Sequence, residues 1–417
     1  MVKTASKNTG RKSNATKTAA TVESDKCTLS IKPKILTSSL GLLYAAISSN
    51  RQGVDRLKIE VGDGKSLFSV GGDVGVEIAY KANKTLKAET VQVSCKQIKS
   101  LASYLDTSDQ QLTLGEEKVT VANRKRTYSY ELLTYKDVFP EDKAEYEPVA
   151  KIKALEFKQA LDKVIPFVDN DLKTIFSGVC LQLKSVDPSV DEDVNSDTLG
   201  LTLTGITVPS MMSTVTINVD SVDTNSLSSL EETTIVLPKK AASFIASQAE
   251  DFTLLISEKS VRFEWLNVKC SIQTLKGTYQ NVDEILEKVS GNNVEVEFNR
   301  NDLFNALKRH QVTASEVEFS IEGETCKLSQ STEAGSGAEN IYCRNDSAEF
   351  ITLNLPIDNL VKVLTSISSE TVIFKLDLEP DKGESEPSNN ILIQDGDATY
   401  CLAQLIASNQ SDEEDEE

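Results

Sequence analysis

The sequence predicts an α+β fold built from three repeats of one domain. Two stretches, "QLTLGEEKVTVANRKRTYSYELLTYKDVF" from Gln111 and "FTLLISEKSVRFEWLNVKCSIQTLKGTY" from Phe252, share one rhythm of strands and turns. A third, less similar copy lies near the C-terminus, as "ETVIFKLDL" followed by "NNILIQDGDATYCLAQLIA". A helix candidate precedes each copy, so helix and hairpin repeat together.

The helix candidates before the hairpins span residues 93–105, 237–249 and 355–367. In the third, apolar residues recur at the spacing of one helix face. Pro238 and Pro356 stand at the start of the second and third candidates, and a first helical turn tolerates proline. We therefore expect three equivalent helices packed against the hairpins.

Each repeat also opens with a strand and a helix, and these openings begin at Cys27, Lys151 and Val294, which are 124 and 143 residues apart. These spacings are ordinary domain sizes. The prediction is three domains over residues 27–147, 148–290 and 291–407. Residues 1–26 are rich in Lys, Thr, Ser and Ala and are expected to form a disordered basic extension, and residues 408–417 an acidic tail.

The strand candidates alternate apolar and polar residues, as in Leu112, Leu114, Val119 and Val121. This period of two predicts antiparallel sheets with one buried face and one solvated face. Helices would cover the buried face.

Catalytic and metal-binding chemistry has few candidates in this sequence. The seven cysteines are dispersed without a CxxC pair, which favours reduced thiols in a cytoplasmic protein. The single histidine, His310, excludes a histidine cluster. "GDGKS" at residues 62–66 lacks the glycine spacing of a phosphate loop, and the acidic stretch 187–200 lacks the glycine of a calcium loop. We therefore predict no enzyme activity, no metal and no cofactor.

Positive charge is concentrated in the helix candidates. The chain carries a formal charge of −20, which by itself argues against a nucleic-acid partner. Five of six helix candidates nevertheless have a net charge of +2, and the sixth is neutral. Helices that line one surface together could hold a phosphate backbone there. The alternative is that these cations pair locally. The predicted DNA-facing residues are Lys32, Lys34, Arg51, Lys96, Lys99, Lys151, Lys153, Lys158, Lys163, Lys239, Lys240, Arg300, Lys308 and Arg309.

These motifs, in this order, resemble the bacterial-type sliding clamp, the beta subunit of DNA polymerase III. The resemblance covers roughly residues 27–407 and rests on "YSYELLTYKDVFPE", "FKQALDKVIPFVDNDLKTIFSGVCLQL", "IVLPKKAASFI" and the final "NNILIQDGDATYCLAQLIA". It implies a head-to-tail homodimer that closes into a ring, with helices around the hole and sheets outside. Double-stranded DNA would thread the hole without base-specific contact, and a replicative polymerase and a clamp loader would dock on one face.

The resemblance also implies two protein surfaces. A partner-peptide groove would lie between the second and third domains, where the chain has "TGITVPS" in place of a "DGHR"-like turn. Its expected residues are Phe176, Thr204, Val208, Pro209, Pro238, Ala242, Cys401, Ala403 and Leu405. The dimer interface would bring Tyr128 and Tyr130 against Val312 and Thr313 of a second copy.

Two alternatives to a DNA clamp stay open on the sequence. One is a clamp-like protein-interaction scaffold that does not encircle DNA. The other is an unrelated β-rich adhesin or structural protein, which the dispersed cysteines and the N-terminus without a hydrophobic signal segment disfavour. The basic helices favour the clamp over both.

Overall fold

The computed structural model describes most of the chain between Cys27 and Gln404. The described ranges are 27–50, 54–62, 64–81, 88–171, 174–185, 198–222, 234–289, 294–333, 335–345, 347, 350–376 and 390–404. The predicted basic extension, the predicted acidic tail and most of the acidic stretch 187–200 lie outside these residues, as do Arg51 and Leu405.

One order of elements occurs three times, as strand, helix, four strands, helix, three strands. The first unit contains β1 (Cys27–Ile31), α1 (Pro33–Ser49), β2 (Leu57–Gly62), β3 (Lys65–Val70), β4 (Val74–Lys81), β5 (Glu89–Val93), α2 (Cys95–Ala102), β6 (Gln110–Leu114), β7 (Lys118–Asn123) and β8 (Ser129–Leu133).

The second unit contains β9 (Glu147–Ile152), α3 (Ala154–Val164), the short 3₁₀ helices η1 (Ile165–Phe167) and η2 (Ile175–Ser177), β10 (Gly178–Ser185), β11 (Thr198–Thr207), β12 (Met211–Ser221), β13 (Thr234–Pro238), α4 (Lys239–Ala246), β14 (Phe252–Ile256), β15 (Ser260–Trp265) and β16 (Val268–Gln273). The helix α5 (Val282–Val289) follows it.

The third unit contains β17 (Val294–Asn299), α6 (Arg300–His310), β18 (Glu316–Glu322), β19 (Thr325–Thr332), β20 (Gly335–Asn345), β21 (Ile351–Pro356), α7 (Ile357–Ser366), β22 (Thr371–Leu376), β23 (Asn390–Asp395) and β24 (Ala398–Ala403). The α+β class, the repeat and the paired helices are therefore confirmed. We propose that the domain boundaries fall in the connections 134–146 and 290–293, close to those expected.

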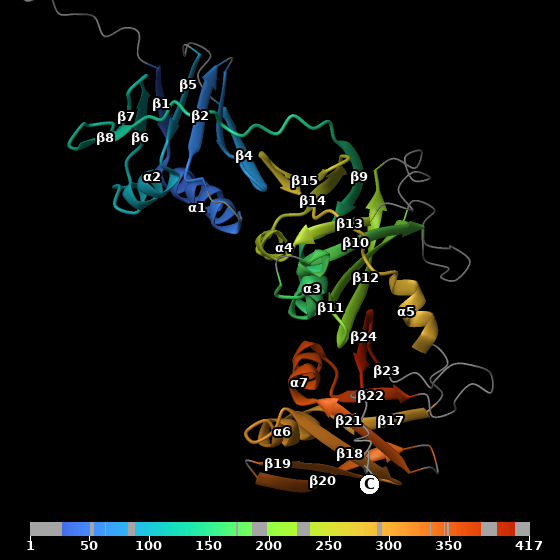
Figure 1. Ribbon diagram of the computed structural model, residues 1–417. Helices are drawn as coiled ribbons and strands as arrows, with labels where there is room; N and C mark the ends of the chain where they lie inside the picture. Colours follow the sequence, from blue (N-terminus) through green and yellow to red (C-terminus); the bar gives the residue numbers. More distant parts are fainter. Residues whose placement is uncertain are drawn as a thin grey trace, which may run out of the picture.

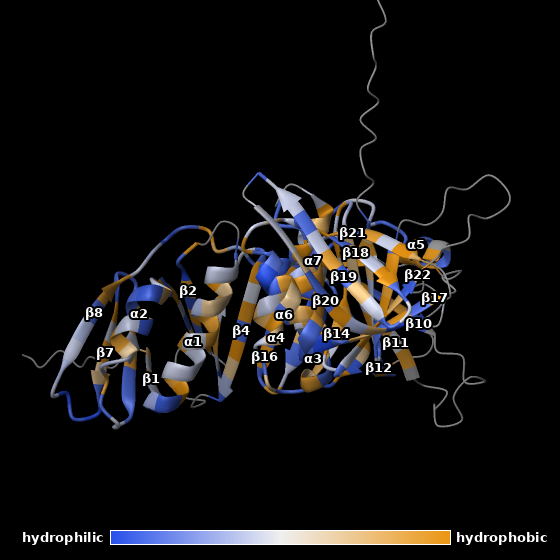
Figure 2. Ribbon diagram, turned by 90° about the horizontal axis from the view of Figure 1, so that it is seen from below, coloured by the Kyte–Doolittle hydropathy of each residue, from blue (hydrophilic) through white to orange (hydrophobic). Residues whose placement is uncertain are grey.

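The three units form an arc (Figure 1). Helices α2, α1, α4, α3, α7 and α6 follow one another along the inner side of the arc, and α5 lies on the outer side. The strands stand behind the six inner helices. Figure 2 shows hydrophobic residues interleaved with hydrophilic ones along the strands, as expected for sheets with one buried face. The core between helices and sheets includes Leu40, Phe157, Phe263, Phe298 and Phe374, all buried.

Neighbouring units are joined by sheet pairing. The last strand of the second unit, β16, pairs antiparallel with β4 of the first, so that Cys270 faces Val76. The last strand of the third unit, β24, pairs antiparallel with β12 of the second, so that Tyr400 faces Ser213. The two joints thus use equivalent strands, and each makes one continuous sheet across a unit boundary.

Local sequence explains where the helices start. Pro33 occupies the first turn of α1, Ser94 caps α2 by accepting a hydrogen bond from the Gln97 amide, and Asn299 caps α6. Pro238 and Pro356 are the cap residues before α4 and α7, one position earlier than the first helical turn where we expected them. An extended φ/ψ at the cap suits proline equally well.

Helix α5 was not among the predicted helices. Its sequence, VDEILEKV, places Val282, Ile285, Leu286 and Val289 on one face, which is a readable amphipathic pattern. Because each repeat was expected to contain only two helices, this short helix of two turns, which lies between the strands of two repeats, was not predicted. The helix packs over the outer face of the second unit, against the sheet that contains β10, β11 and β12.

Candidate nucleic-acid interface and partner surfaces

The inner face of the arc carries most of the predicted DNA-facing cations. Lys34 lies on α1, Lys96 and Lys99 on α2, Lys240 on α4 and Lys308 on α6. All are exposed except Lys99, which is half-buried because its ammonium lies 4.0 Å from the centre of the Tyr44 ring. A cation held by an aromatic face keeps its charge, so the contact positions Lys99 without neutralising it. Lys32, just before α1, is exposed as well.

Several of the predicted cations form ion pairs or donate hydrogen bonds within the chain. Lys153 pairs with Glu156 at 3.0 Å, Lys158 with Asp162 at 2.9 Å, and Arg309 with Glu339 at 2.6 Å. Lys163 pairs with Asp395, and Arg300 donates to the Ile367 carbonyl. Four of these residues are thus in ion pairs within the chain, which is the local pairing left open above, and their contact with DNA stays a prediction. Sequence spacing did not show this, since two of the partners lie far away along the chain. Lys151 lies on the strand β9.

One cation pair spans two units. Lys239, the first residue of α4, donates to the Val168 carbonyl and to Asn170. Burial and the positive charge of Lys362, on α7 of the third unit, lower the pKa of Lys239. Two like charges brought together repel each other, and an anion placed between them relieves the repulsion. The carboxylate of Asp169 acts in the opposite direction and raises this pKa, so part of the repulsion is already offset within the chain.

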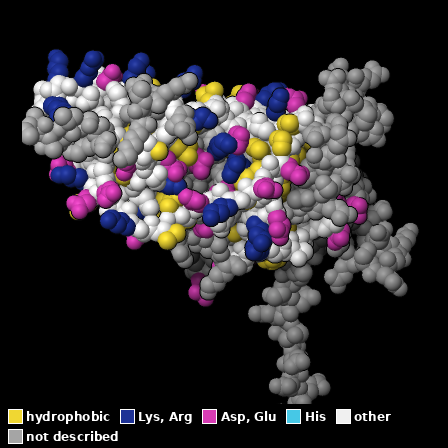
Figure 3. Space-filling model, turned by 90° about the horizontal axis from the view of Figure 1, so that it is seen from above, with side chains coloured by type: hydrophobic (Ala, Val, Ile, Leu, Met, Phe, Trp, Pro, Cys, Tyr) yellow, Lys and Arg dark blue, Asp and Glu magenta, His cyan; other side chains and the backbone are white. Residues whose placement is uncertain are grey.

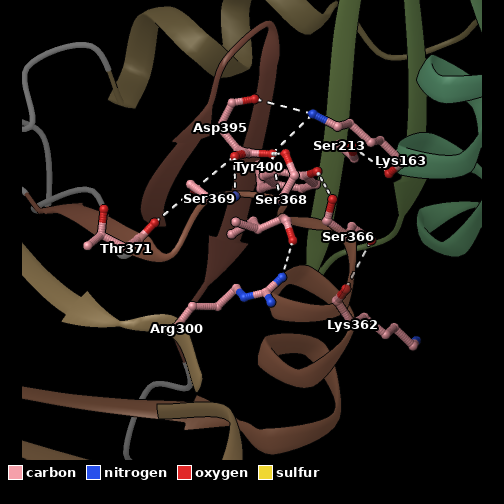
Figure 4. Close-up of polar contacts among 11 residues, drawn as sticks. Lys163, Ser213, Arg300, Lys362, Ser366, Ser368, Ser369, Thr371, Asp395 and Tyr400 are labelled. Atoms are coloured by element: carbon pink, nitrogen blue, oxygen red, sulfur yellow. Dashed lines mark hydrogen bonds and ion pairs between the residues drawn. The ribbon is translucent and has the colours of Figure 1, made fainter. Parts of the chain in front are cut away.

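The same joint is fastened by a buried carboxylate (Figure 4). Asp395, at the end of β23, accepts hydrogen bonds from the backbone and hydroxyl groups of Ser368 and Ser369 and from Lys163 of α3. Burial alone would raise the pKa of this carboxyl, but these bonds outweigh burial and lower the pKa to about 2. Tyr400 packs beside it, with its ring 5.4 Å from Phe167. Lys163 therefore holds two units together.

The outer side of the same joint carries a second, separate apolar cluster. Ile206, Met212, Tyr279 and Cys401 are buried in it, and Phe176, Ile285 and Leu286 pack against it while half-buried. The Tyr279 hydroxyl donates to the Thr204 carbonyl at 3.3 Å, and the Tyr279 and Phe176 rings lie 5.3 Å apart. Linker residues and α5 therefore form part of this surface, which the sequence analysis did not anticipate.

The predicted groove residues divide into two groups. Val208 and Pro209 are exposed, and Phe176, Pro238 and Ala403 are half-buried. Thr204, Ala242 and Cys401 are buried, and their place in the groove wall stays a prediction. A neighbouring hollow of about 290 Å³ lies over β11, β12 and β24 and is lined by Thr202, Thr214, Thr216, Thr399, Val282 and Leu286 among others.

The first and third units each have a strand with an edge that is largely unpaired among the described residues. The four-stranded sheet β1–β6–β7–β8 ends at β8, and β20 pairs with β19 on one side and with β17 only over Cys343–Asn345. Tyr128 and Tyr130 lie beside and on β8, with ring centres 5.8 Å apart. Val312 and Thr313 follow α6, and Gln330 donates to the Thr313 hydroxyl at 2.7 Å.

The repeat shows which positions of β8 correspond to buried positions at the two joints. Tyr130 faces Val121 in its hairpin, as Cys270 faces Phe263 and Tyr400 faces Ile393. Cys270 and Tyr400 are each 0% exposed, because a neighbouring unit covers them, whereas Tyr130 is 49% exposed. The exposed tyrosine therefore stands where the fold elsewhere puts a covered residue.

Other surfaces carry both signs of charge side by side, as the view in Figure 3 shows. Within the described residues, no cluster of His, Cys, Asp and Glu side chains is placed to hold a metal ion. His310 is buried, with its Nε2 3.5 Å from Glu339. All seven cysteines are free and buried, and burial raises the pKa of Cys180 and Cys95 to about 12. No helix in the described ranges has both the length and the apolar character needed to cross a membrane.

Comparison with solved structures gives the same fold throughout. A DnaN sliding clamp (DNA polymerase III subunit beta) from Bartonella birtlesii, bound to griselimycin, superimposes with a TM-score of 0.73 over 91% of this chain and 100% of that chain, at 17% identity. A DNA polymerase sliding clamp from Pseudomonas aeruginosa gives 0.74 at 14% identity, with the same coverage. The Helicobacter pylori beta clamp bound to a DNA ligase peptide gives 0.71 at 16% identity.

Sequence comparison is weaker and points the same way. The chain is 25% identical over 166 residues to a beta sliding clamp from Buchnera aphidicola subsp. Rhopalosiphum padi. The match spans 38% of this chain and 45% of that relative, so less than half of the relative's length is covered. No protein-family model matches the chain. The chain has the sliding-clamp fold, and the resemblance stated from its motifs is confirmed at that level.

Proposed function

We propose that this chain is a DNA sliding clamp, a processivity factor that encircles double-stranded DNA and tethers a replicative polymerase. The observation that carries the proposal is the inner face of the arc, on which six helices bring lysines of all three units together while the chain as a whole is acidic. Lysine ammonium groups that face the DNA backbone contact phosphates and not base edges, so the contact is independent of DNA sequence.

Free lysines supply the DNA contact, and paired ones do not. Lys96, Lys240, Lys308 and Lys362 are exposed on inner helices and form no ion pair among the described residues. Each phosphate that such a cation neutralises releases counterions, which makes binding sensitive to salt. Few contacts at one time suit a protein that must move along DNA.

Ring closure follows from repeating the joint that the chain already uses twice. At both joints, the last strand of one unit pairs with a strand of the preceding unit, namely the third of the four strands between its two helices. The two pairs are β16 with β4 and β24 with β12. The unused strands of these two kinds are β8 and β20. A second copy that supplies β20 would cover β8, and two such contacts close a ring of two chains in head-to-tail order.

The same step predicts the register of that contact. Cys270 faces Val76 and Tyr400 faces Ser213 at the existing joints. Glu339 faces Leu328 as Ile78 faces Phe68, so Gly337 corresponds in the repeat to Val76. The pair equivalent to Cys270 and Val76 is therefore Tyr130 and Gly337. A residue without a side chain leaves room for an aromatic ring across the strands, and pairs of this kind stabilise sheets.

The repeat supports the predicted partners of Tyr130. Phe167, which touches the Tyr400 ring, is the third residue after α3, and Thr313 is the third residue after α6. The smaller threonine would leave space for a tyrosine from the second copy. We therefore retain the interface of Tyr128 and Tyr130 with Val312 and Thr313.

The outer apolar surface between the second and third units is the proposed docking site for partner peptides. Phe176, Ile285, Leu286 and exposed Val208 present apolar atoms there, and apolar grooves of this kind accept short linear peptides. A clamp loader would use the same surface to open the ring. We propose no catalysis, and action in the cytoplasm, because the chain is similar in fold to bacterial sliding clamps.

The deciding experiment compares retention on closed circular and linear duplex DNA of equal length, with dimer state measured by sedimentation. A clamp stays on the circle and slides off linear ends, whereas ordinary DNA binding treats both alike. Equal loss from both, with an intact dimer, would reject encirclement. The alternative, a clamp-like scaffold that does not encircle DNA, would then lead.

A further inference from the structure

We propose that the side-chain amide of Gln330 accepts a hydrogen bond from the hydroxyl of Tyr130 of a second copy, beside the bare backbone of Gly337. The inference rests on the ring closure proposed above, and it adds the groups that select the partner and its register. Tyr130 lies on β8 and Gln330 on β19, at opposite ends of the arc (Figure 1). The two residues therefore meet only between copies.

The side-chain oxygen of Gln330 has no hydrogen-bond partner. Its Oε1 is buried and unsatisfied, whereas its Nε2 donates to the Thr313 hydroxyl at 2.7 Å. That hydroxyl donates its own proton to the His310 carbonyl at 3.4 Å, so its oxygen can accept from Nε2, which sets the orientation of the Gln330 amide. Oε1 is thus a buried acceptor that lacks a donor, and a group that supplies one is favoured there.

The side chain of His310 lies at the same place and is unsatisfied as well. It is 4% exposed, and its Nε2 has no hydrogen-bond partner. The nearest carboxylate, of Glu339, is 3.5 Å away and is held by Arg309. A Cβ at Gly337 would stand 3.1 Å from Gln330 Nε2 and 3.6 Å from His310 Cε1. Both polar side chains therefore border the space over Gly337.

A polar residue at the position of His310 sets the third unit apart from the other two. His310 is the eleventh residue of α6, and the eleventh residues of α1 and α3 are Leu43 and Val164. Both of these apolar residues are 0% exposed. The helix position beneath each internal joint is therefore apolar, whereas the one beneath the unpaired edge of β20 carries an imidazole.

The position of Gln330 shows the same difference. Gln330 faces Gly337 across β19 and β20, and the residues at its place in the first and second units are Val70 and Gly205. Neither of these has a polar side chain. Of the three units, the one whose edge is offered to another molecule thus carries polar groups at both positions.

Tyr130 can supply the missing donor. Its hydroxyl forms no hydrogen bond among the described residues, whereas the hydroxyl of the neighbouring Tyr128 bonds to Gln110 at 2.9 Å. Pairing of Tyr130 with Gly337 of the second copy puts a phenol against the Gln330 amide. Water does not reach Oε1 in the single copy, so the unbranched and half-buried Gln330 side chain turns outward as the bond forms.

A hydrogen bond at this place selects one partner and one register. A slip of β8 by one residue would turn Tyr130 to the opposite face of the sheet and leave Gln330 without its donor. An apolar edge would accept other registers and other strands more readily. The internal joints form between neighbours in one chain, but the outer contact must choose its partner from solution, which explains why its residues are polar.

The test is a double-mutant cycle on the dimer dissociation constant of the full-length protein, measured by fluorescence-detected sedimentation of a dilution series. Tyr130→Phe removes the hydroxyl, and Gln330→Leu removes the amide at similar size. Each ring contains the contact twice, so a roughly fivefold loss per contact raises the dissociation constant roughly 25-fold for either variant. The double variant should be no weaker than either single variant, because both lost groups belong to one bond.

Tyr128→Phe is the matched control. It makes the same change on the same strand edge, but its hydroxyl is already bonded within its own unit, so the dissociation constant should stay within about twofold of wild type. Urea midpoints at concentrations where the chain is monomeric show that Gln330→Leu folds.

His310 gives a second, independent measurement, because it is the only histidine in the sequence. In untagged protein labelled with ¹³C-histidine, its Cε1–H signal should move as the dimer forms, since an aromatic ring then packs over Gly337. Tyr130→Phe keeps the ring and should keep this shift at concentrations where the variant is dimeric.

Losses that simply add in the cycle, an equal loss from Tyr128→Phe, a His310 signal that stays in place on dimerisation, or a chain that remains monomeric would each overturn the contact. Retention on circular DNA, measured on the same proteins, keeps the two proposals apart. A wild-type ring that holds DNA while the cycle shows no coupling retains the proposed function and rejects this contact. Coupled losses in a dimer that leaves circular DNA freely support this contact and reject encirclement.

Discussion

Lys163 of α3 donates to Asp395 of β23 at 3.1 Å, across the boundary between the second and third units. Asp395 is 5% exposed, and the ion pair is completed by two serines from the turn after α7. A buried carboxylate with its partners in place stabilises the arrangement, and loss of one partner leaves an uncompensated charge. The pair therefore sets how firmly two units of the arc are held.

Asp395→Asn should destabilise this joint at neutral pH. Because the folded protein holds the pKa of Asp395 at about 2, below its ordinary value, the stabilisation is present above about pH 4 and is lost as pH falls toward 2. The shift corresponds to about 2 kcal/mol of unfolding free energy. Urea midpoints of wild type and variant should therefore differ at pH 7 and converge at low pH. Asp397→Asn, at an exposed neighbour, is the control and should match wild type.

Neutralising a free lysine should affect DNA binding more than neutralising a paired one. Lys240→Gln is expected to reduce the slope of log affinity against log salt by up to about 0.9, the value for one phosphate contact. Lys158→Gln should change it less, because Asp162 already holds Lys158 at 2.9 Å. Duplex binding measured over a series of salt concentrations checks this. A larger change for Lys158 would mean that the ion pair opens on DNA.

Tyr130→Asp together with Tyr128→Asp should give monomers in sedimentation experiments. The reason is that a carboxylate would enter the position that is fully buried at both internal joints. Tyr104→Asp changes an 87% exposed tyrosine at the end of α2 and serves as the control. A dimer that survives the double substitution would place the subunit contact elsewhere.

Val208→Asp should lower stimulation of the cognate replicative polymerase without lowering the thermal midpoint. Val208 is 47% exposed in the turn between β11 and β12, so the substitution alters the protein surface and leaves the hydrophobic core intact. Val222→Asp, at a 39% exposed valine beyond the end of β12, is the matched control. Leu405→Arg remains a prediction from the sequence for the same groove. Unaltered stimulation by Val208→Asp would move the groove away from this turn.

Periodicity was enough to predict the repeat, the inner helices and the hairpins, because the core residues that define each unit recur in register. Val119 pairs with Leu132, and Val261 pairs with Ile272. These pairings agree with the sequence alignment of the first two repeats, in which Val119 and Val261 are equivalent. The interface tyrosines could be proposed because aromatic residues on an edge strand need a cover. The burial of Cys270 and Tyr400 at the positions equivalent to Tyr130 supports that reasoning.

Charge pairing could not be predicted in the same way. Lys163 lies in the helix candidate 151–168, which has a net charge of +2, and nothing near it in the sequence indicates that Asp395 pairs with it. Arg309 and Glu339 are likewise brought together by the packing of α6 on β20. The burial of Thr204 and Ala242 could not be predicted for a related reason, because alignment with a groove does not show how deeply a side chain lies.

The angles at the internal joints of the arc determine whether copies of the chain can close into a ring. A contact between unlike surfaces closes only if the rotation between successive units divides a full turn, and otherwise it continues into a helical fibre. Six units would each contribute about 60°. Any substitution that alters the angle at the β12–β24 joint would therefore add its error twice per ring, and strand pairing at β8 and β20 would then favour open polymers over a closed circle.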